Sequence, residues 1–311
     1  MDHRSLVQLG RTRLEVTRLG LGTAPLAGLY EPVTEQAAAG VVDSALAAGI
    51  RLFDTAPLYG YGDAERRLGR ALTPGVRDDL VVATKVGRLL HSDQAVFDFS
   101  YTGVMRSVEE SLERLGLDRV DLLHIHDPDG HFDEALSGAF KALDELRAQG
   151  TIGAVGAGMN QAPMLVDLAR RATFDCFLLA GRYTLLDQSG LDELLPLCAS
   201  RGIGVIIGGV YNSGVLADPH HSPRYDYGPA ASSVIDRALA FEAVCERHSV
   251  PLRAAAIQFP FGHPAVASVL SGARSVAEVE DNVAMVTWPI PDGLWADLRS
   301  AGLLPGTVPT P

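Results

Sequence analysis

The 311-residue sequence has little cysteine and no long hydrophobic run, and both absences narrow the class of protein. Its three cysteines, Cys176, Cys198 and Cys245, lie far apart and form no C-x-x-C pair. This pattern argues against a disulfide framework or a zinc ribbon and favours buried free thiols. No stretch approaches ~18 uninterrupted apolar residues, and the opening residues show no signal-peptide core. We therefore expect a cytoplasmic protein with no membrane-spanning segment.

Positive charge is also scarce. Lys and Arg number 26 against 38 Asp and Glu, which gives a formal net charge of −12. Nucleic acids and anionic membranes attract basic surfaces, so this balance argues against both as partners. The sequence contains no G-x-x-x-x-G-K-[ST] motif, which excludes a P-loop. We therefore expect no nucleic-acid or membrane partner, and a monomer or a small homo-oligomer.

Short apolar runs alternate with segments of helical periodicity along the chain. Apolar residues recur at spacings of three and four over residues 104–115, which Gly116 ends, and again over 132–146. A turn around Gly10 joins residues 6–9 to 14–16 and predicts a small hairpin. The predicted strands that follow number eight and lie at residues 18–21, 51–53, 80–83, 120–125, 152–156, 176–180, 204–207 and 267–270.

This alternation predicts an α/β fold, because parallel strands need long crossover connections and read as continuous apolar runs. Eight such units match a (β/α)8 TIM barrel with an N-terminal β-hairpin, in one domain spanning residues 1–311. A doubly wound open sheet is the second possibility. If that sheet bound a dinucleotide, it should carry G-x-G-x-x-G after the first strand, and residues 20–25 lack the third glycine.

Polar side chains follow three neighbouring predicted strands, where a barrel places its chemistry. Asp54 and Tyr59 follow the second strand, Lys85 the third and His126 the fourth. The positive charge of a lysine lowers the pKa of a nearby phenol, and an aspartate keeps the lysine charged. A histidine can orient the reacting oxygen while the tyrosine acts as general acid or base. No side chain supplies a hydride, so this set implies a nicotinamide cofactor.

These motifs resemble the aldo-keto reductase family. The resemblance rests on residues 54–60 (DTAPLYG), Thr84-Lys85 and 123–127 (LHIHD), and extends over nearly the whole chain. It implies a (β/α)8 barrel that binds NAD(P) at the C-terminal face and uses a tetrad, which falls here on Asp54, Tyr59, Lys85 and His126. Residues 96–112, 153–161, 181–188 and 208–214 resemble the sugar 1-dehydrogenase branch, which contains L-fucose (D-threo-aldose) and L-galactose dehydrogenases and pyridoxal 4-dehydrogenases.

The resemblance also implies a set of cofactor contacts: Gly22, Thr23, Asp54, Asn160, Tyr211, Asn212, Ser213, Gly214, Leu216, Gly272, Arg274, Glu278 and Asn282. Where relatives carry Ser-Asn and a glutamine for the carboxamide, this chain has Met159-Asn160 and Ala180. Asn160 is equally well interpreted as the N-cap of a helix over residues 161–169. Relatives that prefer NADP carry cations near the 2′-phosphate, whereas this chain has Glu278, which favours NAD. Arg274 keeps NADP possible.

In this branch the expected reaction is oxidation of an anomeric C1 hydroxyl to a lactone. Tyr59, as a phenolate, would take the hydroxyl proton, His126 would position the oxygen, and the C1 hydride would pass to the nicotinamide. Phe97 and Tyr101 are candidate substrate contacts, with Tyr59 and His126, and the loops over 88–101 and 211–231 are expected to choose the substrate. A pyridoxal 4-dehydrogenase and a general NADPH-dependent aldehyde or ketone reductase are alternatives.

Two interpretations from other classes stay open. His124 and His126 form an H-x-H on a strand, with both rings on one side, as in the zinc sites of barrel amidohydrolases. A metal-dependent barrel hydrolase is therefore a remote alternative, although we expect no metal. A barrel of this type can also serve as a nucleotide-sensing subunit without catalysis, because fold does not fix function. The complete tetrad argues against that interpretation.

Overall fold

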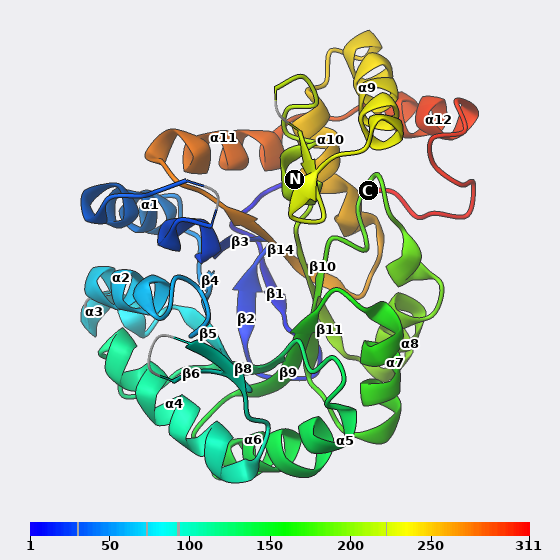
Figure 1. The fold of residues 1–311 in the computed structure, drawn as a ribbon. Coiled ribbons are helices and arrows are strands. Elements are labelled where there is room, and N and C mark those ends of the chain that lie inside the picture. Colours follow the sequence, from blue (N-terminus) through cyan, green and yellow to red (C-terminus); the bar gives the residue numbers. More distant parts are fainter. Residues whose placement is uncertain (30, 73, 92–93, 222) are drawn as a thin grey trace.

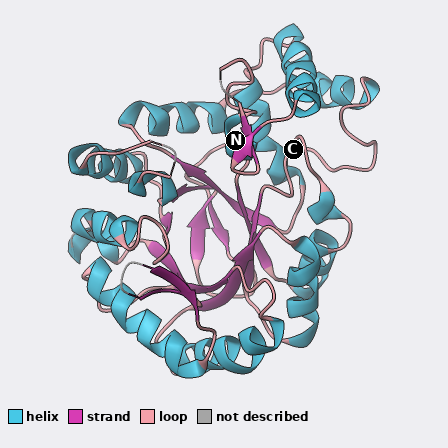
Figure 2. Cartoon of the chain, viewed as in Figure 1, coloured by secondary structure: helices cyan, strands magenta, loops and turns pink. Residues whose placement is uncertain are grey.

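The computed structural model describes residues 1–311 except 30, 73, 92–93 and 222. Its centre is a closed barrel of parallel strands, surrounded by helices (Figures 1 and 2). The barrel strands are β3 (Leu19–Gly22), β4 (Leu52–Asp54), β5 (Val81–Val86), β8 (Leu122–His126), β9 (Ala154–Met159), β10 (Cys176–Ala180), β11 (Gly204–Gly208) and β14 (Val266–Gly272).

Each barrel strand pairs with the strands before and after it in the chain, and β14 pairs with β3 to close the ring. All eight predicted strands are present, with ends that differ by a few residues. The predicted (β/α)8 barrel is thus confirmed, and the open doubly wound sheet is wrong. The strands are buried almost throughout, as parallel strands enclosed by helices must be.

The outer layer consists of helices that follow the strands along the chain. They are α1 (Glu35–Ala47), α2 (Asp63–Ala71), α3 (Pro74–Arg77), α4 (Tyr101–Leu115), α5 (Phe132–Glu134), α6 (Lys141–Ala148), α7 (Ala162–Arg171), α8 (Leu194–Arg201), α9 (Ser232–Arg247), α10 (Leu252–Gln258), α11 (Val276–Thr287) and α12 (Asp292–Ser300). Short 3-10 helices are η1 (Ala24–Ala27), η3 (Ser189–Leu191), η4 (Asn212–Gly214) and η5 (Phe259–Gly262).

The two helices with the clearest periodicity form as predicted. Ser100 caps α4 through a bond from the Gly103 amide, and Gly116 ends the helix at a φ of 63°. The predicted helix over 132–146 is continuous through α5 and α6, but its middle, η2 (Ala135–Phe140), is a π-helical turn. Gly138 faces the Phe99 carbonyl there, so closely that a β-carbon would clash.

The predicted N-terminal hairpin is β1 (Leu6–Gln8) with β2 (Glu15–Thr17), paired antiparallel. In Figure 1 it is the dark blue pair seen through the ring of strands. Leu9 and Val16 of this segment are fully buried and pack with interior residues of the barrel such as Leu52 and Val81. The hairpin therefore closes one end of the barrel, and the opposite end carries the polar residues discussed below.

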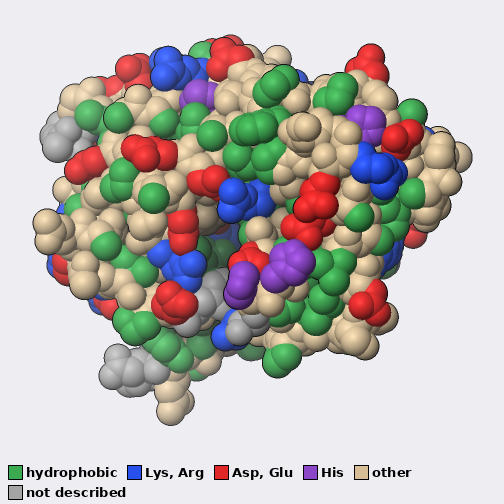
Figure 3. Space-filling model, turned by 90° about the horizontal axis from the view of Figure 1, so that it is seen from above, with side chains coloured by type: hydrophobic (Ala, Val, Ile, Leu, Met, Phe, Trp, Pro, Cys, Tyr) green, Lys and Arg blue, Asp and Glu red, His purple; other side chains and the backbone are tan. Residues whose placement is uncertain are grey.

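Further small elements lie outside the barrel. They are two antiparallel pairs, β6 (Arg88–His91) with β7 (Gln94–Phe97), and β12 (Arg224–Tyr225) with β13 (Gly228–Pro229). All three cysteines are buried free thiols, as the sequence predicts. In the described part of the chain, no helix is both long enough and apolar enough to span a bilayer. On the face drawn in Figure 3, acidic and basic side chains are interspersed.

Candidate active site

Three adjacent strands carry the predicted tetrad to one end of the barrel. Asp54 is the last residue of β4, Lys85 is the penultimate residue of β5, and His126 is the last residue of β8. Tyr59 lies in the loop after β4, where Gly60 adopts a φ of 59°. A β-carbon on Gly60 would lie 2.4 Å from the Ala27 side chain, so glycine is what lets this loop turn beside η1.

The tetrad side chains contact one another at this end of the barrel. Lys85 Nζ donates to Asp54 Oδ1 at 2.5 Å and to the Thr55 carbonyl at 2.8 Å. The same ammonium lies 4.7 Å from the centroid of the Tyr59 ring. The Tyr59 and His126 rings meet edge-on, with centroids 6.0 Å apart. A phenol placed between an ammonium and an imidazole in this way can exchange a proton with a substrate oxygen.

The charge on Lys85 is strongly maintained. Burial by itself lowers the lysine pKa, but the charges of Asp54 and Tyr59 and their hydrogen bonds outweigh burial, so the net pKa of Lys85 is raised. Burial raises the pKa of Tyr59, and the Lys85 charge only partly opposes that effect. The sequence-based expectation of a lowered tyrosine pKa is therefore incorrect, because it counted the ammonium and left out burial.

Both histidines of β8 are neutral in the folded chain. Burial, helped by the Lys85 charge, holds the pKa of His126 well below its usual value and that of His124 at about 3. His124 is fully buried against Gly156, and both of its ring nitrogens lack a partner among the described residues. Within the described ranges, no group of three or more His, Cys, Asp or Glu is arranged to hold a metal ion.

A cavity of about 320 Å³ opens over the tetrad. Its lining combines apolar side chains with charged and polar ones. Its lining residues are Ala24, Ala27, Leu29, Leu58, Tyr59, Gly60, Lys85, Arg88, His126, Asp127, Gly158, Met159, Asn160, Leu178, Ala180 and Tyr227. Arg88, Asp127 and Tyr227 line the cavity although the sequence did not predict them as site residues. Asp127 could have been found by reading one residue beyond His126, whereas no local signal marks Tyr227.

The two aromatic candidates for substrate contact do not line this cavity. Phe97 is 52% exposed and stacks on His131, with ring centroids 5.2 Å apart. The Tyr101 hydroxyl donates to Glu145 Oε2 at 2.8 Å, which holds that ring against α6 on the outside of the barrel. Phe97 and Tyr101 thus contact His131 and Glu145 rather than the residues that line the cavity. The loops over 88–101 and 211–231 each contribute to the cavity, although residues 92–93 and 222 lie outside the described part.

Several predicted cofactor contacts surround an edge of the barrel that is rich in unpaired polar atoms. Thr23 follows Gly22 at the end of β3 and is fully buried, and its hydroxyl has no partner among the described residues. The side-chain oxygens of Asn212 and Ser271 are also buried and have no hydrogen-bond partner among the described residues. Buried polar atoms normally have partners, so these three oxygens mark a place suited to a polar ligand. Donors and acceptors of this kind fit the ribose, phosphate and carboxamide groups of a nicotinamide cofactor.

The loop after β11 supplies a further group of these residues. Asn212, Ser213 and Gly214 have consecutive φ values of 45°, 59° and 113°, a left-handed run that costs energy and often occurs at functional sites. Tyr211 donates its hydroxyl to Asn282 Oδ1 at 3.1 Å, and Asn282 Nδ2 donates to the Gly272 carbonyl at 3.4 Å. Leu216 is fully buried in the core, and its amide donates to the Tyr211 carbonyl.

The residues chosen to distinguish NAD from NADP bind each other. Glu278 Oε1 accepts from Arg274 Nη2 at 2.8 Å, and Oε2 accepts from the Arg274 amide at 2.8 Å. Arg274 also pairs with Glu31 at 3.0 Å. Its guanidinium therefore faces two carboxylates. Glu278 can accept a hydrogen bond from a ribose hydroxyl only if its ion pair with Arg274 opens, or if one carboxylate oxygen accepts from both groups.

Asn160 lies at the mouth of the catalytic cavity, between β9 and α7. The N-cap of α7 is Gln161, so the interpretation of Asn160 as that cap is wrong. Asn160 also lines a second cavity, together with residues of the loops after β8 and β10. Ala180, which stands about where relatives carry a glutamine, lines the catalytic cavity.

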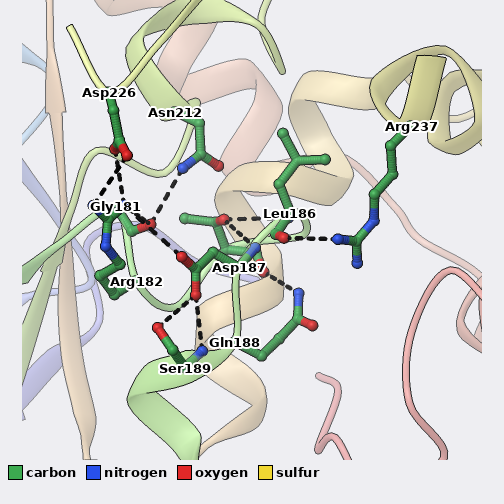
Figure 4. Close-up of polar contacts among 10 residues, drawn as sticks. Gly181, Arg182, Leu186, Asp187, Gln188, Ser189, Asn212, Asp226 and Arg237 are labelled. Atoms are coloured by element: carbon green, nitrogen blue, oxygen red, sulfur yellow. Dashed lines mark hydrogen bonds and ion pairs between the residues drawn. The ribbon is translucent and has the colours of Figure 1, made fainter. Parts of the chain in front are cut away.

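A bidentate ion pair ties the β12–β13 hairpin to the loop after β10 (Figure 4). Arg182 Nη1 and Nη2 donate to the two carboxylate oxygens of Asp226 at 2.8 and 3.1 Å. In the same figure, Asn212 Nδ2 donates to the Gly181 carbonyl at 3.2 Å. Asp226 precedes Tyr227, which lines the catalytic cavity, so this pair fixes one wall of the site.

Comparisons with known proteins agree with this geometry. The profile described as the Aldo/keto reductase family matches residues 18–302. The chain is 43% identical to pyridoxal 4-dehydrogenase of Microbacterium luteolum, over 95% of this chain and 97% of that protein. It is 41% identical to D-threo-aldose 1-dehydrogenase of a Pseudomonas species, over 94% and 96%. L-galactose dehydrogenase of Arabidopsis thaliana is 36% identical, over 92% and 89%.

Solved structures give the same result for the fold. The holo form of aldo-keto reductase AKR11C1 from Bacillus halodurans superposes with a TM-score of 0.80 at 28% identity, covering 96% of each chain. Glycerol dehydrogenase AKR11B4 from Gluconobacter oxydans superposes with a TM-score of 0.76 at 22% identity, covering 96% of this chain and 95% of that one. At 22% identity, the similarity to glycerol dehydrogenase concerns the fold alone.

Proposed function

The chain belongs to the aldo/keto reductase family, and from this we propose that it is an NAD-dependent dehydrogenase that oxidises the anomeric C1 hydroxyl of an aldose to the lactone. The family assignment makes it a nicotinamide-dependent oxidoreductase of small molecules. The observation that carries the proposal is the contact of Asp54, Lys85, Tyr59 and His126 beneath a cavity whose polar wall suits a polyhydroxylated substrate.

Each tetrad residue has a distinct task in this reaction. Tyr59, as the phenolate, takes the proton of the C1 hydroxyl. The Lys85 ammonium stabilises that phenolate, and Asp54 holds the ammonium in place. His126 is neutral and hydrogen-bonds the C1 oxygen, which orients the C1–H bond. The cofactor, when bound, supplies the hydride acceptor that no side chain provides.

Three further assignments support or complete the proposal. Thr23, Asn212, Ser271 and Asn282 would hold the cofactor, because three of them have unpaired buried oxygens and the fourth links β14 to the loop after β11. We infer a preference for NAD because Arg274 is already matched by Glu278 and Glu31, which would resist a dianionic 2′-phosphate. We also infer a single cytoplasmic domain over residues 1–311, whose barrel strands run from β3 to β14.

A second candidate function is pyridoxal 4-dehydrogenase, favoured by the 43% identity to an enzyme of that name. The two candidates share a chemistry. Aldoses and pyridoxal each carry an aldehyde that closes onto a hydroxyl of the same molecule to form a cyclic hemiacetal. Loss of a hydride from the hemiacetal carbon and of a proton from its hydroxyl gives a lactone in both cases. The tetrad supports either reaction, so the cavity wall must decide between them.

The test is reduction of NAD+ by the purified enzyme with L-fucose, D-arabinose, L-galactose, L-arabinose, pyridoxal and simple aldehydes, followed by product analysis. We expect an aldose to give the highest kcat/KM and a lactone as the first product. A pyridoxal kcat/KM above that of every sugar would support the second candidate. An open-chain aldehyde reduced far faster than any sugar is oxidised would make the protein a general carbonyl reductase.

A further inference from the structure

The residue after His126 is a carboxylate that the mechanism does not use. Asp127 lines the catalytic cavity and has a φ of 42°, in the left-handed region. Its amide donates to the Gly158 carbonyl at 3.0 Å. These features turn the chain at the end of β8 and place the carboxylate on the cavity wall.

Arg88 holds this carboxylate in position from the neighbouring strand. Its Nη1 donates to Asp127 Oδ2 at 2.5 Å, and both side chains are about a quarter exposed, at 26% and 28%. The guanidinium also lies over the Phe97 ring, 5.4 Å from its centroid. Arg88 follows Gly87, where a β-carbon would strike the Phe99 ring, so the backbone is fixed on that side as well.

The pair lies beside the reacting atoms. Asp127 Oδ2 is 3.6 Å from His126 Nε2, the nitrogen that faces the C1 oxygen in the proposed mechanism. Among the described residues, Arg88 is the hydrogen-bond partner of this carboxylate, and it uses Oδ2. The second oxygen, Oδ1, is therefore available to a substrate group attached one carbon away from the reacting centre.

We propose that Asp127, held by Arg88, selects aldoses by accepting a hydrogen bond from the C2 hydroxyl next to the reacting carbon. This inference rests on the proposed function. A hydrogen bond to a charged acceptor in a partly buried site corresponds to roughly 10- to 100-fold in kcat/KM. Pyridoxal offers no such hydroxyl. It carries an acidic phenolic oxygen next to the aldehyde, and an anion there is repelled by Asp127.

The experiment compares L-fucose, 2-deoxy-L-fucose and pyridoxal with NAD+, in the wild type and in Asp127→Asn. We expect the wild type to prefer L-fucose over its 2-deoxy analogue by roughly 10- to 100-fold. In Asp127→Asn this preference should fall below about threefold, because the neutral amide makes the weaker of the two hydrogen bonds. Activity on pyridoxal should stay the same or rise. Asp133→Asn, which removes an exposed carboxylate on α5 that does not line the cavity, is the control and should keep the wild-type preference.

The outcomes separate this inference from the proposed function. If the wild type oxidises no aldose, the proposed function is wrong and the role of Asp127 falls with it. If the wild type oxidises L-fucose and 2-deoxy-L-fucose equally well, the inference is wrong and the function stands, a result that requires no variant to fold. If Asp127→Asn loses activity on L-fucose, its 2-deoxy analogue and pyridoxal to the same extent, Asp127 only supports the loop, and the inference is again overturned.

Discussion

Tyr59 is the residue on which the proposed chemistry depends most directly. Tyr59→Phe removes the hydroxyl that exchanges the proton, and general acid–base groups contribute on the order of 10²–10⁴ in rate. We expect kcat to fall by about 10³ or more. Cofactor affinity should be nearly unchanged, because Thr23, Asn212, Ser271 and Asn282, which we propose hold the cofactor, lie outside the Tyr59 loop. Stopped-flow or steady-state rates, together with a fluorescence titration of NADH, measure both quantities.

The control for this variant is close by in the same loop. Tyr61 is 53% exposed and does not line the catalytic cavity, so Tyr61→Phe should behave as the wild type. Retention of most activity by Tyr59→Phe would remove the phenol from the mechanism.

In the proposed mechanism, the ionisation of Tyr59 determines how the reaction depends on pH. Tyr59 must be ionised to accept a proton, and burial raises its pKa, so oxidation should speed up with rising pH through pH 9 and beyond. The neutral state of His126 adds no break near pH 6.5, because its pKa lies well below that value. Below the tyrosine pKa, log kcat/KM should rise by about one per pH unit.

Lys85→Met should lower kcat strongly and move this rise to still higher pH, because the ammonium is the group that opposes the effect of burial on Tyr59. The variant also leaves the Asp54 carboxylate buried without its partner. Lys141→Met, at an exposed position of α6, is the matched control. A profile that keeps its wild-type midpoint in Lys85→Met would contradict the coupling between lysine and tyrosine.

At the scale of elements, we expect the turn from β14 into α11 to determine the cofactor preference. The wild type should have a higher kcat/KM with NAD+ than with NADP+. Glu278→Arg removes one of the carboxylates that face Arg274 and adds a cation, so the ratio should shift toward NADP+ by at least about tenfold.

Glu280→Arg provides the same change of charge two residues along α11, at an exposed position, and should leave the ratio unchanged. A wild type that prefers NADP+ would mean that Arg274 binds the phosphate despite its two acidic neighbours.

The contact between α2, β5 and α4 contains a carboxylate with no exposed area. Glu65 accepts from Thr84 Oγ1 at 2.6 Å and from Arg114 Nε at 2.5 Å. Glu65→Ala removes the buried carboxylate nearest to Arg114 and leaves Arg114 only the more distant Glu110, at 3.8 Å, so it should lower the free energy of unfolding by ~3 kcal/mol. Urea denaturation measures this change. Glu35→Ala, which breaks exposed ion pairs with Arg67 and Arg70, should have a much smaller effect.

At the scale of the whole molecule, the sequence predicts the barrel and its tetrad because both follow from regular features. Buried parallel strands are continuous apolar runs, and the residue that follows each run lies at the same end of the barrel. Asp54, Lys85 and His126 could be placed together on that basis alone. Helix α4 was equally predictable, from its periodicity and Gly116.

The remaining parts depend on contacts that no local pattern encodes. The strand β7 contains the apolar residues Ala95, Val96 and Phe97 yet is exposed along its whole length, so an apolar run alone does not tell it from a barrel strand. Tyr227 reaches the cavity because Arg182 binds Asp226, a pairing across 44 residues of chain. Tyr101 was proposed as a substrate contact because it is an aromatic residue of the loop over 88–101, and the sequence did not reveal its bond to Glu145. The net pKa of Tyr59 likewise depends on burial, which the spacing of residues does not report.

The burial of Lys85 has a practical consequence for handling the protein. Lys85 and Lys141 are the lysines of the chain, and Lys85 is 1% exposed while Lys141 is exposed on the outer ring of helices. An amine-directed reagent should therefore modify one lysine side chain in the native state and both after denaturation. Coupling through Lys141 would attach the enzyme to a surface at a defined lysine and leave the Lys85 amine untouched. The appearance of a second reactive lysine would report the moment at which the barrel opens.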